Sequence, residues 1–474
     1  MSKVLKNWSY LLISDVIQQV IGFVVVILLA RKLSPDGYGL FNVIISVATI
    51  FSVVAQFGMS NVVIRELSLN PETTASFIKK IIIPFRILSF VVAIIAFFIY
   101  NTINVTVDDT RSIYIVLIIL NLSLWNFSES IAFGHEVTKY SSILNIFVSI
   151  VWLISILAIP EKFLVVNTIL LVYCLLHFVR GVSYVAIISK VFYLPQLFKS
   201  KKTTLSRLQF FKMVLPYVWL ILIGTLSLEL PIQFLNKNAS LNEVGYFAVG
   251  YKLMIPISIA VSTAFKAIFP MFTKLFARDK LEFENKLKIG FNLIIVSGTL
   301  IAIISSLVSK YLIPMVFGES YSSSVLVFNF LVWFSVISIL DALLSNGLSS
   351  AYKERVLAIL ATIDVIIMLP LLYYASYFGA WALALVKLTT GIVFLGYHLY
   401  VFIKVLKVDI FNKNLIILLS FYFLSMTVCL LINFEVYQVL ILSIITLFFV
   451  KIKNSPFVAT LNVIKKIINK KTNI

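Results

Sequence analysis

Ionisable side chains lie inside long apolar runs of this sequence, with acidic and basic residues in equal number. A charge at the centre of a bilayer costs at least about 2.5 kcal/mol on insertion scales, so such side chains are expected to face a protein interior or water. Their number predicts a chain that encloses a polar path. The residues are Asp15, Arg86, Glu129, Arg180, Glu229, Lys252, Lys266, Asp341, Asp364 and Lys387.

Polar residues at helical spacing follow one face of the first apolar run and one face of the fourth. Amides and carboxylates on one face suit a hydrated wall that binds sugar hydroxyls, with Trp125 able to stack on a sugar ring. Polar contacts between neighbouring helices are the alternative interpretation. The wall residues are Asp15, Gln18, Gln19, Asn121, Trp125 and Glu129.

Depth in the membrane suggests two ion pairs. At 1.5 Å per residue, Glu229 and Lys252 differ in depth by about 3 Å, and Asp364 and Lys387 both lie close to mid-membrane. Each pair is either functional or a charge-neutralised packing contact. Asp364 and Glu229 are the candidate ion-coupling residues.

The elements that position these side chains must be membrane helices. Apolar and aromatic residues make up 61% of the 474 residues and charged residues 12%, and the mean hydropathy is +1.05. Soluble proteins are nearer half apolar and a quarter charged, which excludes a soluble, disordered or disulfide-stapled chain. Cys174 and Cys429, far apart in apolar runs, predict neither a bridge framework nor a metal site.

A window of about 19 residues predicts an all-α, polytopic membrane protein with about 14 transmembrane helices. Barrel strands would alternate polar and apolar residues instead. The last span is short enough to be interfacial. The predicted spans are 10–30, 41–64, 81–100, 112–134, 142–159, 164–188, 212–235, 244–270, 289–313, 325–347, 356–375, 378–403, 415–432 and 437–450.

Basic residues indicate the orientation. Most of the 39 Lys and Arg residues fall in loops on one side of the predicted topology, which the positive-inside rule assigns to the cytoplasm, together with both termini. The net charge of +19 therefore reflects topology, and no nucleic-acid partner is expected. Residues 455–471 form a basic tail that is either an interfacial amphipathic helix or a frayed end.

A weak internal repeat divides the chain. Gly39 precedes Phe41 by two residues at the start of the second span, and Gly245 precedes Phe247 likewise at the start of the eighth. A chance match is the alternative. We expect two six-helix lobes related by a parallel repeat. The expected domains are an N-lobe of helices 1–6 (1–200), a C-lobe of helices 7–12 (201–403), and helices 13–14 with the basic cytoplasmic tail (404–474).

Motifs for catalysis are missing. The sequence contains no GxxxxGK[ST] loop, GxSxG elbow or HExxH helix, so we expect neither an enzyme nor a resident cofactor. His177 and His398 lie in spans, where a lone histidine is more often a packing residue than a ligand. No cluster has metal-ligand spacing.

Several segments resemble the polysaccharide-exporter branch of the multidrug/oligosaccharidyl-lipid/polysaccharide exporter superfamily. They are ARKLSPDGYGLFN at 30–42, QFGMSNVVIRE at 56–66, EVGYFAVGYK at 243–252 and FPMFTK at 269–274. The resemblance covers essentially the whole chain in length and span number. Its motifs are specific to the superfamily but do not identify the substrate.

The resemblance implies a polysaccharide biosynthesis, Wzx-type flippase of the bacterial cytoplasmic (inner) membrane that works by alternating access. Such a protein moves an undecaprenyl-pyrophosphate-linked oligosaccharide repeat unit to the external leaflet for O-antigen (lipopolysaccharide) or capsule assembly. It implies a lipid-linked oligosaccharide and membrane lipid as partners, together with a polysaccharide polymerase and a chain-length regulator. No cofactor is implied, and coupling to protons or sodium is expected.

A pyrophosphate head carries charge that cannot cross hydrocarbon unaided, so basic side chains must hold it. Arg86, Arg180, Lys252 and Lys387 are the candidate pyrophosphate ligands. We expect Arg180 and Lys252 to contribute most, because of their depth and the lobe-facing role of helix eight in the family.

Three alternatives stay open. Peptidoglycan-precursor flippases of the superfamily carry cationic residues on helices one, two and eight, whereas helix one here offers Asp15. A cation-coupled multidrug exporter could use that carboxylate for proton coupling. A membrane polysaccharide polymerase or ligase would be expected to carry a large basic external loop, which the predicted topology lacks.

Overall fold

The computed structural model describes residues 3–103, 110–191, 206–410, 413–432, 435–451 and 456–462. Every element in these ranges is an α-helix or a short 3-10 helix, and no strand occurs in them. The chain divides into two compact units, Met1–Ala248 and Val249–Ile474. The prediction of an all-α, polytopic membrane protein is confirmed.

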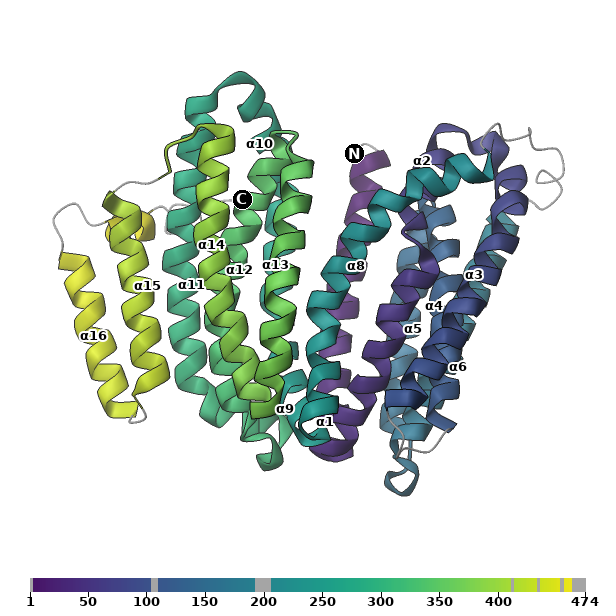
Figure 1. Ribbon diagram of the computed structural model, residues 1–474, viewed down its shortest axis with the longest axis horizontal. Coiled ribbons are helices and arrows are strands. Elements are labelled where there is room, and N and C mark those ends of the chain that lie inside the picture. Colours follow the sequence, from purple (N-terminus) through teal and green to yellow (C-terminus); the bar gives the residue numbers. More distant parts are fainter. Residues whose placement is uncertain are drawn as a thin grey trace. The chain divides into compact units, whose positions relative to one another are not determined.

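The first unit contains the helices up to α8 and most of α9 (Figure 1). Its helices are α1 (Lys3–Gln56), α2 (Met59–Leu69), η1 (Pro71–Thr73), α3 (Thr74–Ile103), α4 (Thr110–Gly134), α5 (Thr138–Ala158), η2 (Glu161–Phe163), α6 (Val166–Val191), α8 (Arg207–Asn238) and α9 (Leu241–Lys252). The unit ends later than the predicted lobe boundary at residue 200, because α8 packs against α1 and α2.

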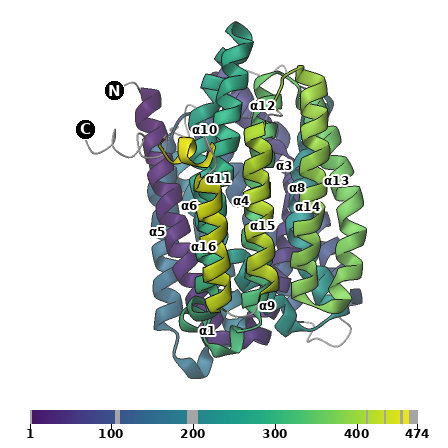
Figure 2. The same ribbon diagram turned by 90° about the vertical axis from the view of Figure 1, so that its left-hand side faces the viewer.

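The second unit contains the remaining helices. They are α10 (Ile255–Arg278), α11 (Lys280–Phe317), η3 (Glu319–Tyr321), α12 (Ser324–Ser350), α13 (Glu354–Ala375), η4 (Ser376–Phe378), α14 (Ala380–Leu406), α15 (Lys413–Leu431) and α16 (Glu435–Lys451). Helix α14 packs against α12 and α13, and α16 lies beside α15 (Figure 2).

Eleven of the described helices are long and apolar enough to cross a membrane, or up to twelve if a bent pair counts as one span. The fourteen predicted spans outnumber these by three. Helix α1 joins the first two predicted spans, and the second of them continues into α2. The eighth predicted span is divided between α9 and α10, and the fourteenth is the 17-residue α16.

The bent pair consists of Tyr437–Lys451 and Pro456–Asn462, which meet at 88°. Only this first part of the predicted basic tail is described, and it is helical. The lysines of the tail from residue 465 onward lie outside the described residues.

A sharp kink at Ser34 divides α1 into two arms, which run in opposite directions (Figure 1). Ser34 has φ 61° and ψ 165°, a conformation that residues other than glycine rarely adopt. Pro35 follows directly and supplies no backbone N–H, which suits the start of the second arm.

The two glycines of the predicted repeat meet each other beyond this kink. A Cβ placed on Gly39 would lie 2.0 Å from the Leu241 carbonyl oxygen, and one on Gly245 would lie 2.3 Å from the Pro35 carbonyl oxygen. Each glycine thus faces the residue four positions before the other glycine. Only glycine permits this approach, since any side chain would collide with backbone.

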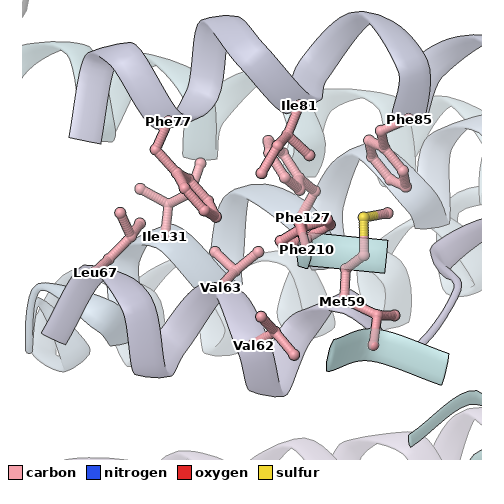
Figure 3. Packing of buried hydrophobic residues seen from close by; sticks show 11 residues of the cluster. Met59, Val62, Val63, Leu67, Phe77, Ile81, Phe85, Phe127, Ile131 and Phe210 are labelled. Atoms are coloured by element: carbon pink, nitrogen blue, oxygen red, sulfur yellow. The ribbon is translucent and has the colours of Figure 1, made fainter. Parts of the chain in front are cut away.

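Apolar side chains of α2, α3, α4 and α8 form a buried cluster in the first unit (Figure 3). The rings of Phe85 and Phe127 are 4.9 Å apart, and those of Phe77 and Phe210 are 5.7 Å apart. In a membrane such contacts stabilise helix packing through van der Waals attraction. The cluster fixes α4, on which three of the predicted site residues lie.

Candidate functional site

Arg180 of α6 is buried, with 7% of its surface exposed, and lies at the centre of a polar network in the first unit. Its Nε and Nη2 donate to Asn145 Oδ1 of α5, at 3.0 and 2.5 Å. Its Cζ lies 3.4 Å from the centroid of the Trp125 ring on α4, a cation–π contact. The guanidinium is therefore held by a neutral amide and an aromatic face.

A carboxylate lies on the far side of the same amide. Asn145 Nδ2 donates to Glu129 Oε1 at 3.0 Å, and the Tyr184 hydroxyl donates to the same oxygen at 2.8 Å. Tyr184 also lies 3.1 Å from Asn145 Oδ1. Asn145 thus connects the cation of α6 with the carboxylate of α4.

Helix α1 reaches the network through Gln18. Arg180 Nη2 lies 3.5 Å from Gln18 Oε1, and Gln18 Nε2 donates to Ser14 Oγ at 3.0 Å. Ser14 in turn donates to the Ser142 carbonyl of α5 at 3.2 Å. Four helices, α1, α4, α5 and α6, therefore contribute to one group of side chains. We call Gln18, Trp125, Glu129, Asn145, Arg180 and Tyr184 the Arg180 cluster.

Two buried polar atoms beside Arg180 have no hydrogen-bond partner among the described residues. They are Trp125 Nε1 and His177 Nδ1. The two rings stack at 5.8 Å between centroids, and Tyr173 meets the His177 ring edge-on at 4.2 Å. An unsatisfied buried polar atom costs free energy, so both atoms are available to a polar ligand.

The predicted polar wall is only partly assembled. Gln18, Trp125 and Glu129 join the Arg180 cluster, whereas Asn121 donates to the Cys174 carbonyl at 3.0 Å in a contact between α4 and α6. The Arg180 guanidinium lies over the face of Trp125 that was expected to stack on a sugar. Stacking on that face would therefore require Arg180 to move.

The remaining predicted residues of this unit lie outside those hydrogen bonds. Asp15 is exposed on α1, and Gln19 of α1 and Glu229 of α8 are half-buried. Arg86 of α3 donates to the Leu120 carbonyl and to Ser123 Oγ, both at 3.3 Å on α4.

A second group of ionisable side chains lies in the second unit. His398 of α14 faces two carboxylates, with Nδ1 2.6 Å from Asp341 Oδ1 of α12 and Nε2 3.2 Å from Asp364 Oδ1 of α13. The exposed side-chain fractions are 7% for His398, 36% for Asp341 and 21% for Asp364. We call these three residues the His398 cluster.

The two ion pairs that depth in the membrane suggested can be compared with the contacts in the structure. Asp364 pairs with His398, whereas Lys387 is buried on α14, eleven residues before that histidine. The predicted pair of Glu229 and Lys252 joins residues of different units, so it stays a prediction.

The sequence alone does not mark Asn145, Tyr184 or His398 as site residues. Asn145 is a single amide within the apolar run 142–159, and a buried amide in a span needs polar partners. The sequence therefore indicates that Asn145 makes a polar contact, but it does not identify the partner. The expectation that a histidine such as His398 is more often a satisfied packing residue than a ligand stays a prediction, and the structure adds that two carboxylates face its ring.

Solved structures show the same fold at low sequence identity. The lipid II flippase MurJ in an inward closed conformation has a TM-score of 0.66 at 13% identity, with 96% of this chain and 98% of MurJ covered. An inward-facing multidrug resistance MATE family transporter of the MOP superfamily has a TM-score of 0.63 at 12% identity, covering 82% of this chain and 95% of that one. A mutant of the Vibrio cholerae MATE transporter VcmN has a TM-score of 0.51 at 14% identity, covering 89% and 98%. No curated protein sequence matches.

The polytopic helical fold of this chain is therefore shared with the MurJ flippase and with MATE transporters. The profile of the family described as "Polysaccharide biosynthesis protein" matches residues 4–276, more than half of the chain. The chain therefore belongs to the polysaccharide biosynthesis protein family, and the resemblance inferred from its sequence motifs is confirmed.

Proposed function

We propose that this protein moves an undecaprenyl-pyrophosphate-linked oligosaccharide from the cytoplasmic to the external leaflet of the bacterial inner membrane. It would do so by alternating access, with both termini in the cytoplasm. The product would enter the assembly of O-antigen, and hence lipopolysaccharide, or of capsule. Membership of the polysaccharide biosynthesis protein family supports this choice.

The observation that carries the proposal is the way in which Arg180 is held. Its guanidinium donates to the neutral amides of Asn145 and Gln18, which orient the cation without neutralising it. Glu129 is reached through Asn145. A buried, oriented cation suits a pyrophosphate, because Arg binds phosphate oxygens through two parallel N–H groups.

The neighbouring atoms suit the sugar end of such a ligand. Trp125 Nε1 donates only, and His177 Nδ1 either donates or accepts according to its tautomer, so the pair suits hydroxyl groups. The polyprenyl tail would stay in lipid. Arg86, Lys252 and Lys387 remain the other proposed pyrophosphate ligands, and Asp364 and Glu229 the proposed ion-coupling residues.

Transport of this kind needs no catalytic residue, and we propose none. The proposed partners are membrane lipid, the polysaccharide polymerase that consumes the flipped unit, and a chain-length regulator. The proposed energy source is a proton or sodium gradient.

Reconstituted vesicles test the proposal. Undecaprenyl-pyrophosphate carrying a labelled disaccharide is placed in the inner leaflet, and its arrival outside is measured by periodate oxidation of the sugar. We expect the protein to raise this rate well above that of protein-free vesicles. An unchanged rate, combined with export of a cationic dye or flipping of lipid II alone, would assign the protein to the drug-exporter or peptidoglycan-precursor class instead.

A further inference from the structure

The contacts of the His398 cluster depend on how many protons its imidazole and two carboxylates share. A neutral imidazole carries one N–H and one lone pair, whereas imidazolium carries two N–H groups. Both ring nitrogens of His398 face a carboxylate oxygen within hydrogen-bond distance. A neutral ring between two ionised carboxylates could satisfy only one of these contacts. The observed arrangement therefore requires two protons, either both on the ring or one on the ring and one on a carboxylate.

Protons suit this geometry better than a metal ion. The imidazole lies between the two carboxylates and takes the position that a cation would need. In the parts of the chain that the structure describes, no group of three or more His, Cys, Asp and Glu side chains could hold a metal ion, this trio included. Sodium also prefers oxygen ligands, and the central group here presents nitrogen.

Other titratable groups also lie on the helices that pack around His398. Helix α12 contributes only Asp341, and Tyr397 lies next to His398, with ring centroids 6.0 Å apart. Lys387, the nearest lysine before His398 on α14, lies about 16 Å away at 1.5 Å per residue. The other titratable groups of α13 and α14 are Glu354, Arg355, Tyr373, Tyr374, Tyr400 and Lys404, and Tyr377 lies in η4.

We propose that the His398 cluster is a proton-binding site that couples the packing of α13 against α14 to a proton gradient. This inference rests on the proposed transport function and assigns its coupling ion. In the protonated form the imidazolium donates to both carboxylates, and the net charge of the cluster is −1. The three groups then hold α12, α13 and α14 together.

Loss of one proton opens one contact. The imidazolium gives its Nε2 proton to Asp364, whose acid form releases it to water, and neutral imidazole remains. The retained proton stays on Nδ1, because the contact to Asp341 is shorter, at 2.6 Å against 3.2 Å. The Nε2 lone pair then faces an ionised carboxylate and repels it, so α13 is released from α14. Neither carboxylate is fully enclosed by the described protein.

Nuclear magnetic resonance of the ¹⁵N-histidine-labelled protein tests the site without any lipid substrate. The sequence contains only three histidines, so His398→Gln identifies the signal. We expect both ring nitrogens of His398 to be protonated near neutral pH, and Nε2 to lose its proton first as pH rises. Replacing potassium by sodium should leave the signal unchanged. A single N–H at neutral pH in the folded protein, or a shift caused by sodium, would overturn the proposal.

Control signals and control variants distinguish a change at His398 from misfolding of the protein. His135 lies outside the spans, and burial lowers its pKa, so its signal should titrate below the ordinary range of histidine. Asp341→Asn should convert the His398 ring to the neutral form, whereas Asp409→Asn, at an exposed connection, should not. A melting curve for each variant confirms folding. An unchanged His398 signal in folded Asp341→Asn protein contradicts the proposed site.

Flipping driven by an imposed pH gradient supplies the functional readout. We expect wild-type flipping to accelerate with the gradient, and His398→Gln to retain downhill flipping while losing that acceleration. His135→Gln should behave as wild type. If no protein flips the lipid, the proposed function fails while the magnetic resonance result still decides the proton site. If folded His398→Gln keeps the full acceleration, the coupling proposal is wrong.

Discussion

At the scale of single residues, the Arg180 cluster differs from an ordinary ion pair in having an amide between its charges. Asn145 accepts from the guanidinium through one oxygen and donates to Glu129 through its nitrogen. Removing that amide leaves a buried cation and a buried carboxylate without their common partner. We therefore expect substitution of the neutral residue Asn145 to disturb the cluster strongly, because both charged groups depend on it.

Asn145→Ala is expected to lower the free energy of unfolding by about 3 to 5 kcal/mol, the range for buried charges that lose a partner. Asn121→Ala is the matched control, because the Asn121 side chain donates to a backbone carbonyl instead of a charged group. We expect it to cost about 0.6 kcal/mol, the average for a side-chain hydrogen bond between membrane helices. Denaturant titration of both variants in the same detergent provides the comparison. If both variants lost the same free energy of unfolding, Asn145 would not act as a bridge between the two charged groups.

Which residues are polar and buried could be predicted at this scale, but their partners could not. Gln18, Trp125, Glu129 and Arg180 can each be selected singly, because polar groups in apolar runs are costly. Their meeting depends on how four helices rotate about their axes. The same limit explains why depth alone pairs Asp364 with Lys387, whereas the structure pairs it with a histidine 34 residues away.

At the scale of elements, α1 and α9 approach each other closely at two glycines. Gly39 and Gly245 occur there in a reciprocal arrangement, each against backbone near the other. The sequence repeat predicted that these positions correspond. It could not predict their contact, because a short motif carries no information about which of two equivalent turns approaches the other.

Gly39→Ala and Gly245→Ala are each expected to destabilise the protein by about 1 to 3 kcal/mol, the usual cost of overpacking. The added Cβ would meet backbone atoms, which cannot rotate away as a side chain does. Gly22→Ala is the control, since nothing lies within 4 Å of its added Cβ and alanine favours a helix. Thermal melting in detergent measures all three. If both Gly39→Ala and Gly245→Ala melted at the wild-type temperature, the two helices could move apart at these glycines without loss of stability.

At the scale of the whole molecule, the class could be predicted from composition and from the length of the apolar runs. Backbone groups in lipid must be satisfied within each segment, so these runs had to be helices. The number of spans could not be predicted as well, because a kinked helix at Ser34 and a break after Lys252 change how spans are divided. Family membership then assigns the chain to polysaccharide biosynthesis, and its fold is shared with MurJ and MATE proteins.

The most direct test of the account compares Arg180→Gln with Arg111→Gln in the vesicle flipping assay, at matched protein abundance and over a range of lipid-linked disaccharide concentrations. Arg111 donates to Asn167 Oδ1, which is not a member of the Arg180 cluster, so its variant should flip at the wild-type rate. Arg180→Gln should reduce kcat/KM roughly tenfold or more, as expected for losing a charge-assisted contact worth about 1.5 to 3 kcal/mol. Folded Arg180→Gln protein that flips the lipid as fast as wild type would contradict the account.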